Sequence, residues 1–137
     1  MIVVDANLMV VSAVKDDRRE MVFQQFERWV TQGVELHAPY LAVYEVTNSL
    51  TRLAVASTIT INDAADCWND ISLLPVIYHP ITNGRRVIEI SIQLKRQSAY
   101  DAAYLSLAES LGAELWTLDG PLYRNASGLG LPVRLLT

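Results

Sequence analysis

Residues 2–7, with the sequence IVVDAN, join a short run of β-branched residues directly to an acid. Such a run, bounded by polar residues, is typical of a buried strand. The sequence LWTLD at residues 115–119 has the same form, an apolar stretch that ends in an aspartate. We therefore predict that Asp5 and Asp119 lie at the carboxyl ends of two strands, the edge where open α/β sheets bind their ligands.

Short apolar runs and amphipathic stretches alternate along the rest of the chain. Apolar residues that recur with helical spacing predict helices, and short apolar runs between polar or proline residues predict strands. The predicted helices span residues 16–32, 40–56, 62–73, 83–96 and 98–111, with a short helical turn at 122–126. The predicted strands span residues 2–4, 35–38, 76–78, 115–118 and 133–136. This alternation indicates an α/β fold with a five-stranded, mostly parallel sheet covered on both faces.

The composition bounds the class of protein. Of the 137 residues, 51% are hydrophobic and 19% charged, which excludes a disordered chain and fits one domain, residues 1–137. The single cysteine excludes a disulfide framework and a multi-cysteine zinc site. Because no targeting pattern or long apolar run is present, we expect a cytoplasmic protein with no membrane segment. The net charge of −4 argues against nucleic-acid binding through bulk positive charge.

Four acids lie in surroundings that are not those of ordinary surface acids: Asp5 and Asp119 after strands, Glu45 and Asp101 within apolar helical segments. If two strand ends and two helices bring these carboxylates to one edge of the sheet, each raises the pKa of the others. A divalent cation would remove this repulsion, and hard oxygen ligands favour Mg²⁺ or Mn²⁺. Asn7 and Thr117, each two residues from a strand-end acid, are candidates for supporting hydrogen bonds.

Each acid taken alone also has an ordinary structural explanation. Asp5 would cap a helical turn at residues 6–10, and Asp101 would form a capping box with Ser98 at the start of a helix. Glu45 would be a solvated rim residue, and Asp119 a turn former. The residues alone leave both explanations open, although the combination of four acids favours a site.

Several segments resemble the PIN domain and, within it, the VapC-type toxins of bacterial and archaeal toxin–antitoxin pairs. The most specific match is SAYDAAYLSLA at residues 98–108, which is similar to the family's third acid in its Tyr-Asp-Ala-Ala setting. Residues 2–7, 44–48 and 117–122 resemble the surroundings of the other three acids, and residues 128–133 resemble the lead into the last strand. Gly120-Pro121 departs from the charged residues that often follow the fourth acid.

The resemblance implies a PIN-like three-layer α/β/α sandwich and a metal-dependent ribonuclease that uses a metal-activated water. It implies that the catalytic acids, which hold Mg²⁺ or Mn²⁺, are Asp5, Glu45, Asp101 and Asp119. It also implies an RNA substrate, a cognate antitoxin and a homodimer, for which helices 40–56 and 62–73 offer Tyr44, Trp68 and Leu73 as candidate contacts. The basic residues that are candidates around the RNA are Arg18, Arg19, Arg85, Arg86, Lys95, Arg96 and Arg124.

Three other functions compete with that of a metal-dependent ribonuclease. A haloacid-dehalogenase-type phosphatase also begins with a strand that ends in Asp, but it needs a second Asp where this chain has Asn7. A receiver domain needs a lysine late in the chain, whereas Lys15 and Lys95 are misplaced for it. A catalytically inactive PIN-like scaffold that only binds a partner would be expected to lack one of the acids, and all four are present.

Overall fold

A computed structural model of the chain describes residues 1–96 and 98–137. The elements are β1 (Ile2–Val4), α1 (Ala6–Ala13), α2 (Arg19–Thr31), β2 (Leu36–Pro39), α3 (Leu41–Val55), α4 (Ile61–Ser72), β3 (Val76–His79), α5 (Gly84–Leu94), α6 (Tyr100–Leu111), β4 (Leu115–Thr117), α7 (Gly120–Gly128) and β5 (Val133–Leu135). The strands form one sheet in the order β3-β2-β1-β4-β5, and every neighbouring pair is parallel. The predicted α/β class and five-stranded sheet are thus confirmed.

The strand at the centre of the sheet is the most apolar. In β1, Val3 and Val4 are fully buried, because a parallel sheet covered on both faces offers an apolar layer to each side chain. The neighbouring β2 is buried along its whole length, whereas β3, at the edge of the sheet, is partly exposed. The strand order places β1 in the middle of the sheet, with Asp5 directly beyond its carboxyl end.

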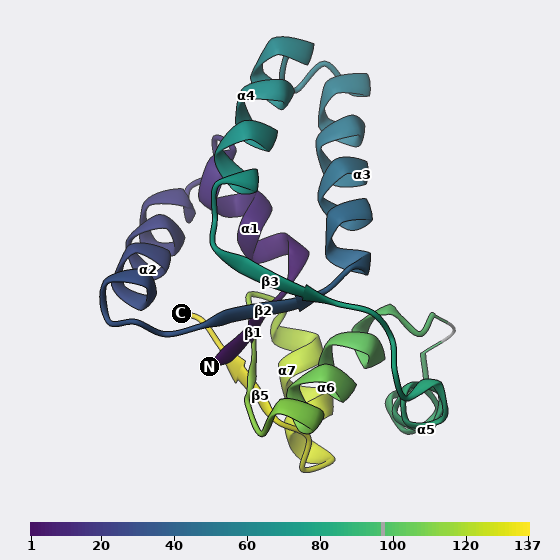
Figure 1. Ribbon diagram of the computed structural model, residues 1–137. Coiled ribbons are helices and arrows are strands. Elements are labelled where there is room, and N and C mark those ends of the chain that lie inside the picture. Colours follow the sequence, from purple (N-terminus) through teal and green to yellow (C-terminus); the bar gives the residue numbers. More distant parts are fainter. Residues whose placement is uncertain (97) are drawn as a thin grey trace.

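Helices cover both faces of the sheet (Figure 1). Helices α1 to α4 lie on one face and α5 to α7 on the other, as expected for the predicted α/β/α sandwich. Helices α1 and α6 are the inner pair, since most of their residues are buried. Helices α3 and α4 extend away from the sheet as an antiparallel pair. None of the helices in the described residues has the length and apolar character needed to span a membrane.

The structure corrects two elements that follow strand-end acids. Residues 6–10 belong to an eight-residue helix, α1, and not to a single turn. Its sequence, ANLMVVSA, is apolar on nearly every side and buried, so it has no amphipathic period that would predict a helix. Helix α7 likewise spans nine residues where a short turn was predicted, with Pro121 in its first turn.

The predicted start of α6 is also wrong. The helix begins at Tyr100, and its N-cap residue, Ala99, makes no side-chain capping bond. The hydroxyl of Ser98 instead accepts a hydrogen bond from the backbone N–H of Tyr100, at 3.2 Å. Asp101 therefore has no role in a capping box, and its carboxylate is left for other contacts.

Candidate active site

The four acids come from elements that meet at one edge of the sheet. Strands β1 and β4 are neighbours, and the chain proceeds from β1 toward β2 and β3 on one side and from β4 to β5 on the other. The crevice beyond such a switch in direction is the usual ligand site of an open α/β sheet. Asp5 and Asp119 lie just past the ends of these two strands, as the sequence predicts.

Both strand-end acids also cap the helix that follows. Oδ1 of Asp5 accepts a hydrogen bond from the backbone N–H of Leu8 at 2.8 Å, at the start of α1. Oδ1 of Asp119 accepts one from the N–H of Leu122 at 2.9 Å, at the start of α7. The capping explanation of Asp5 is thus confirmed, and it is compatible with a site because each cap engages only one of two carboxylate oxygens.

Thr117 joins these two acids. It is fully buried at the end of β4, and its hydroxyl accepts a hydrogen bond from the backbone N–H of Asp119 at 3.0 Å. The same hydroxyl is a hydrogen-bond partner of the Asp5 carboxylate. Asn7 behaves differently, because it is exposed on the first turn of α1 and, in the part of the chain that the structure describes, its side chain makes no hydrogen bond with the acids.

Glu45 has a partner that the sequence did not reveal. The hydroxyl of Tyr104, on α6, donates a hydrogen bond of 2.7 Å to Oε1 of Glu45, on α3. Tyr104 is buried, with only 3% of its surface exposed, and the backbone N–H of Ala6 also faces its hydroxyl. A buried tyrosine needs a polar partner, so the apolar setting of Tyr104, three residues after Asp101, was the available signal.

In the part of the chain that the structure describes, Asp101 is the acid of this set that has a cation within ion-pair distance. Lys95 ends α5 in the left-handed conformation, with φ of 57°, and the next residue, Arg96, brings its Nε to 4.0 Å from Oδ2 of Asp101. Both side chains are 40% exposed, so the pair is a loose contact in solvent. Of the basic residues predicted around the site, Arg96 is the one in contact with an acid of the set.

The charges of the acids are coupled. Burial raises the pKa of Asp5 to about 6, against the hydrogen bonds from Thr117 and Leu8, and the charges of Glu45 and Asp101 raise it further. Burial also raises the pKa of Glu45, where the bond from Tyr104 opposes the shift and Asp101 adds to it. For Asp101, burial raises the pKa, Arg96 lowers it and Asp119 raises it. Each acid therefore acts on at least one other, as the combined pattern predicts.

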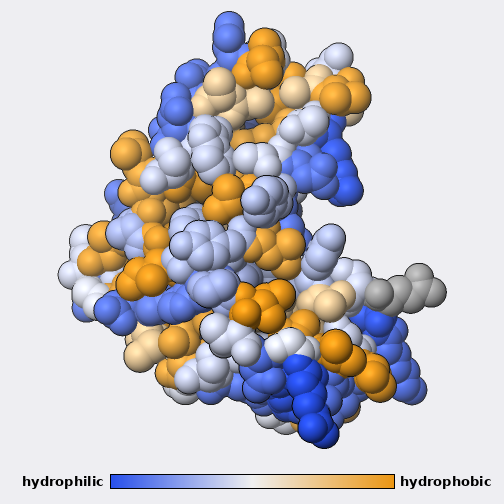
Figure 2. Space-filling view, turned by 45° about the vertical axis from the view of Figure 1, so that its right-hand side comes forward, coloured by the Kyte–Doolittle hydropathy of each residue, from blue (hydrophilic) through white to orange (hydrophobic). Residues whose placement is uncertain are grey.

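The donor set suits a hard divalent cation. The described residues contain no group of three His, Cys, Asp or Glu side chains already arranged as a metal cage. The four carboxylates form a looser cluster, and such a cluster fits Mg²⁺, which commonly keeps several waters and binds through one or two carboxylates. Figure 2 shows the surface hollowed between the α3–α4 pair above and the α5–α6 layer below, the helices that carry Glu45 and Asp101.

Comparisons with known proteins agree with this geometry. A profile of the PIN domain matches residues 3–134. The chain belongs to the PIN-domain family. This PIN chain is 32% identical to Ribonuclease VapC3 of Pyrobaculum aerophilum over 136 residues, which are 96% of the chain and 98% of that relative. It is also 32% identical to Ribonuclease VapC9 of Mycobacterium tuberculosis over 120 residues, 87% of the chain and 86% of the relative.

A solved structure supports the PIN fold independently. The crystal structure of PAE2754 from Pyrobaculum aerophilum superimposes on the PIN chain with a TM-score of 0.73, covering 98% of this chain and 89% of the other. At 21% identity this likeness bears on the fold alone. Within the PIN-domain family, the two relatives named above place the chain in the VapC group, which residues 98–108 also resemble.

Proposed function

We propose that this PIN-domain chain is a metal-dependent endoribonuclease, the toxin of a toxin–antitoxin pair, which hydrolyses RNA phosphodiesters in the cytoplasm. The observation that carries the proposal is the set of four coupled carboxylates beyond β1 and β4. The identity to VapC ribonucleases supports it along most of the chain. No serine or cysteine nucleophile is needed in this chemistry, and the only cysteine, Cys67, lies on α4.

In this proposal Asp5, Glu45, Asp101 and Asp119 hold Mg²⁺ or Mn²⁺. Each of these acids also contacts another group of the protein. When bound there, the ion would supply a water of lowered pKa and would offset charge on the phosphate. Asp5 and Asp119 are oriented by their caps, and Glu45 by the hydroxyl of Tyr104. Thr117 supports the two strand-end acids by hydrogen bonds. Asn7 remains a candidate for a supporting hydrogen bond to a ligand or a water.

The experiment that tests this function is RNA cleavage with controlled metal content. Purified protein should cleave RNA in Mg²⁺ or Mn²⁺. EDTA should abolish the cleavage, because its own oxygen donors bind the ion and remove it from the four acids. Added Mg²⁺ or Mn²⁺ should restore it. Cleavage that continues unchanged in EDTA would contradict the metal dependence, and an absence of cleavage in both metals would contradict the nuclease.

We also propose an antitoxin and a second copy of the chain as protein partners. The support is an exposed apolar surface on α3 and α4, where Tyr44 is 74% exposed and Leu73 is 81% exposed. Trp68 lines a separate groove between the two helices. Exposed apolar area of this kind marks interaction surfaces. Light scattering at micromolar concentration should show a dimer, and a monomer without any co-purifying partner would count against both.

A further inference from the structure

A second groove begins beside the acids and runs away from them between α1 and α3. Its volume is about 360 Å³. One wall starts at Asn7, two residues after Asp5, and the other includes Ser49, one helical turn after Glu45. Arg52 follows on α3, seven residues from Glu45, or about 10 Å along the helix axis. On both helices, the near end of the groove therefore lies within about one helical turn of an acid of the cluster.

The lining of this groove, the α1–α3 groove, combines an apolar floor with a positive rim. Val10, Val14 and Leu53 contribute apolar surface, while Lys15 and Arg52 are exposed cations. A third lining cation, Arg18, is paired with Asp16 at 3.0 Å. Within the described residues, neither Lys15 nor Arg52 has an acid within ion-pair distance.

Stability alone does not explain why Lys15 and Arg52 lie near an acid cluster without forming ion pairs. A chain of net charge −4 places two positive side chains along one groove and leaves them without acidic partners. The polar groups at the near end of the groove, the Asn7 amide and the Ser49 hydroxyl, are able to hydrogen bond to phosphate oxygens. A polyanion that enters the acid cluster would have these groups as its next contacts.

We propose that the α1–α3 groove binds the backbone of an unpaired RNA strand on one side of the bond to be cleaved. This inference rests on the proposed nuclease function. It adds the path that the RNA takes beyond the acids and the residues that contact it there. A groove between two packed helices admits a single strand and not an A-form duplex, whose sequence-reading edges are also hidden. Because the rim offers cations and few base-reading groups, the contact is to the backbone and independent of sequence.

The test measures RNA binding without cleavage. A fluorescein-labelled, unstructured RNA of about 12 nucleotides is titrated with protein in EDTA, and Kd is measured by anisotropy at several salt concentrations. Arg52→Gln and Lys15→Gln should each weaken binding about fivefold near 0.1 M salt, and each should lower the slope of log K against log salt by about 0.7. The double variant should lower the slope by about twice that amount.

Arg28→Gln is the matched control. Arg28 is an exposed cation on α2, its side chain contacts only Gln25, and it lies outside the groove. It should leave both Kd and slope near the wild-type values, and thermal melts should show that all variants are folded. Groove variants that bind RNA as Arg28→Gln does would overturn the proposal. So would binding of a matched duplex as tight as that of the single strand.

A separate arm distinguishes this inference from the nuclease function. The wild-type protein is assayed for cleavage of the same RNA in Mn²⁺. Binding that depends on Arg52 and Lys15 without any cleavage would uphold the groove and reject the nuclease. Cleavage by the wild type, together with unchanged RNA affinity in the groove variants, would support the nuclease function. The same result would contradict RNA binding in the α1–α3 groove.

Discussion

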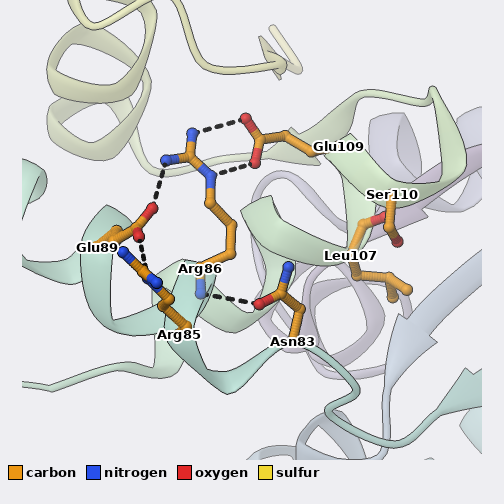
Figure 3. A network of polar contacts seen from close by, with 7 residues as sticks. All are labelled: Asn83, Arg85, Arg86, Glu89, Leu107, Glu109 and Ser110. Atoms are coloured by element: carbon orange, nitrogen blue, oxygen red, sulfur yellow. Dashed lines mark hydrogen bonds and ion pairs between the residues drawn. The ribbon is translucent and has the colours of Figure 1, made fainter.

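Helix α6 carries an acid at each end, and the two ends have opposite surroundings. Near its C-terminal end, Glu109 accepts two hydrogen bonds from the guanidinium of Arg86, at 2.7 and 2.9 Å (Figure 3). Arg86 also reaches Glu89 at 3.4 Å, and Glu89 is paired with Arg85 at 3.0 Å. At the other end, Asp101 faces three further acids and has only Arg96, at 4.0 Å.

The difference shows which charges serve stability and which oppose it. The bonds from Arg86 lower the pKa of Glu109 below its ordinary value, so folding favours the charged form. Burial raises the pKa of Asp101, with Arg96 opposing the shift and Asp119 adding to it, so folding disfavours its charged form. A carboxylate that weakens the fold when ionised is typical of a functional site. The comparison therefore supports the proposed role of Asp101 in the site, and it gives Glu109 a role in the stability of the fold.

The largest expected effect comes from removing one charge at each end of α6. Asp101→Asn should reduce RNA cleavage in Mn²⁺ at least about 100-fold, the scale of losing one essential electrostatic group. Glu109→Gln should leave cleavage within about twofold. In EDTA, Asp101→Asn should melt at the same temperature as the wild type or higher, because clustered carboxylates no longer repel.

Asp5→Asn extends this test to the strand end. Asparagine caps a helix about as well as aspartate, so α1 should keep its start while the charge is lost. Cleavage should again fall at least about 100-fold. Either aspartate variant cutting RNA at nearly the wild-type rate would contradict the site assignment. A loss of cleavage together with a much lower melting temperature would assign the residue to folding instead.

A smaller effect is expected from Tyr104→Phe, which removes the hydroxyl that holds Glu45. Groups that orient a metal ligand typically contribute about 10- to 100-fold to metal affinity. We therefore expect Mn²⁺ to bind at least about tenfold more weakly by calorimetry, with the protein still folded. Tyr78→Phe is the control, since the Tyr78 hydroxyl contacts only the sulfur of Met9, at 3.9 Å. Equal Mn²⁺ affinities in the two variants would show that Tyr104 has no role in positioning.

The pH dependence of stability should separate the acid cluster from the C-terminal end of α6 without any metal. The folded-state pKa of Asp5 is about 6, above the ordinary 3.8. Its contribution to stability is thus fully present below about pH 3.8 and is lost as the pH rises through 6. Between pH 5 and pH 7.5, urea unfolding in EDTA should show a loss of roughly 1 to 2 kcal/mol from Asp5.

Asp5→Asn should flatten this profile, and Glu109→Gln should not. The lowered pKa of Glu109 gives stability that is lost only as the pH falls below its ordinary value of 4.5, outside this window. A wild-type protein whose free energy of unfolding rises from pH 5 to pH 7.5 would show that the acid cluster is not repulsive.

The smallest expected effect is that of Glu109→Gln on stability itself. Its carboxylate and the Arg86 guanidinium are each about one-third exposed, at 32% and 29%. A pair this accessible to water contributes about 1 kcal/mol or less, even with bidentate geometry. Urea unfolding at pH 7.5 should detect this loss at low salt and a smaller one in about 1 M salt, where charges are screened. A loss several times larger would place the network in the folding core.

The sequence predicted the sheet well because its signals are local. A β-branched run such as residues 2–4 indicates a strand by itself, and parallel strands end at one edge, so Asp5 and Asp119 were expected together. Helix α1 was missed because most of its residues are apolar and buried, so the sequence lacks the alternation of apolar and polar faces that predicts a helix. The contact between Tyr104 and Glu45 joins residues 59 positions apart, and no local pattern specifies such a pair.

The two caps at Asp5 and Asp119 have a consequence for how this chain would drift if its chemistry were no longer selected. In such a lineage, helices α1 and α7 would still need a side-chain oxygen at their first turn, so positions 5 and 119 would change mainly to Asn, Ser or Thr. Positions 45 and 101 cap no helix. Position 101 would therefore accept apolar or basic residues, and position 45 would change once Tyr104 no longer needed its oxygen. An inactive descendant would then be recognised by the loss of its second and third acids, while its first and last positions kept residues that cap helices.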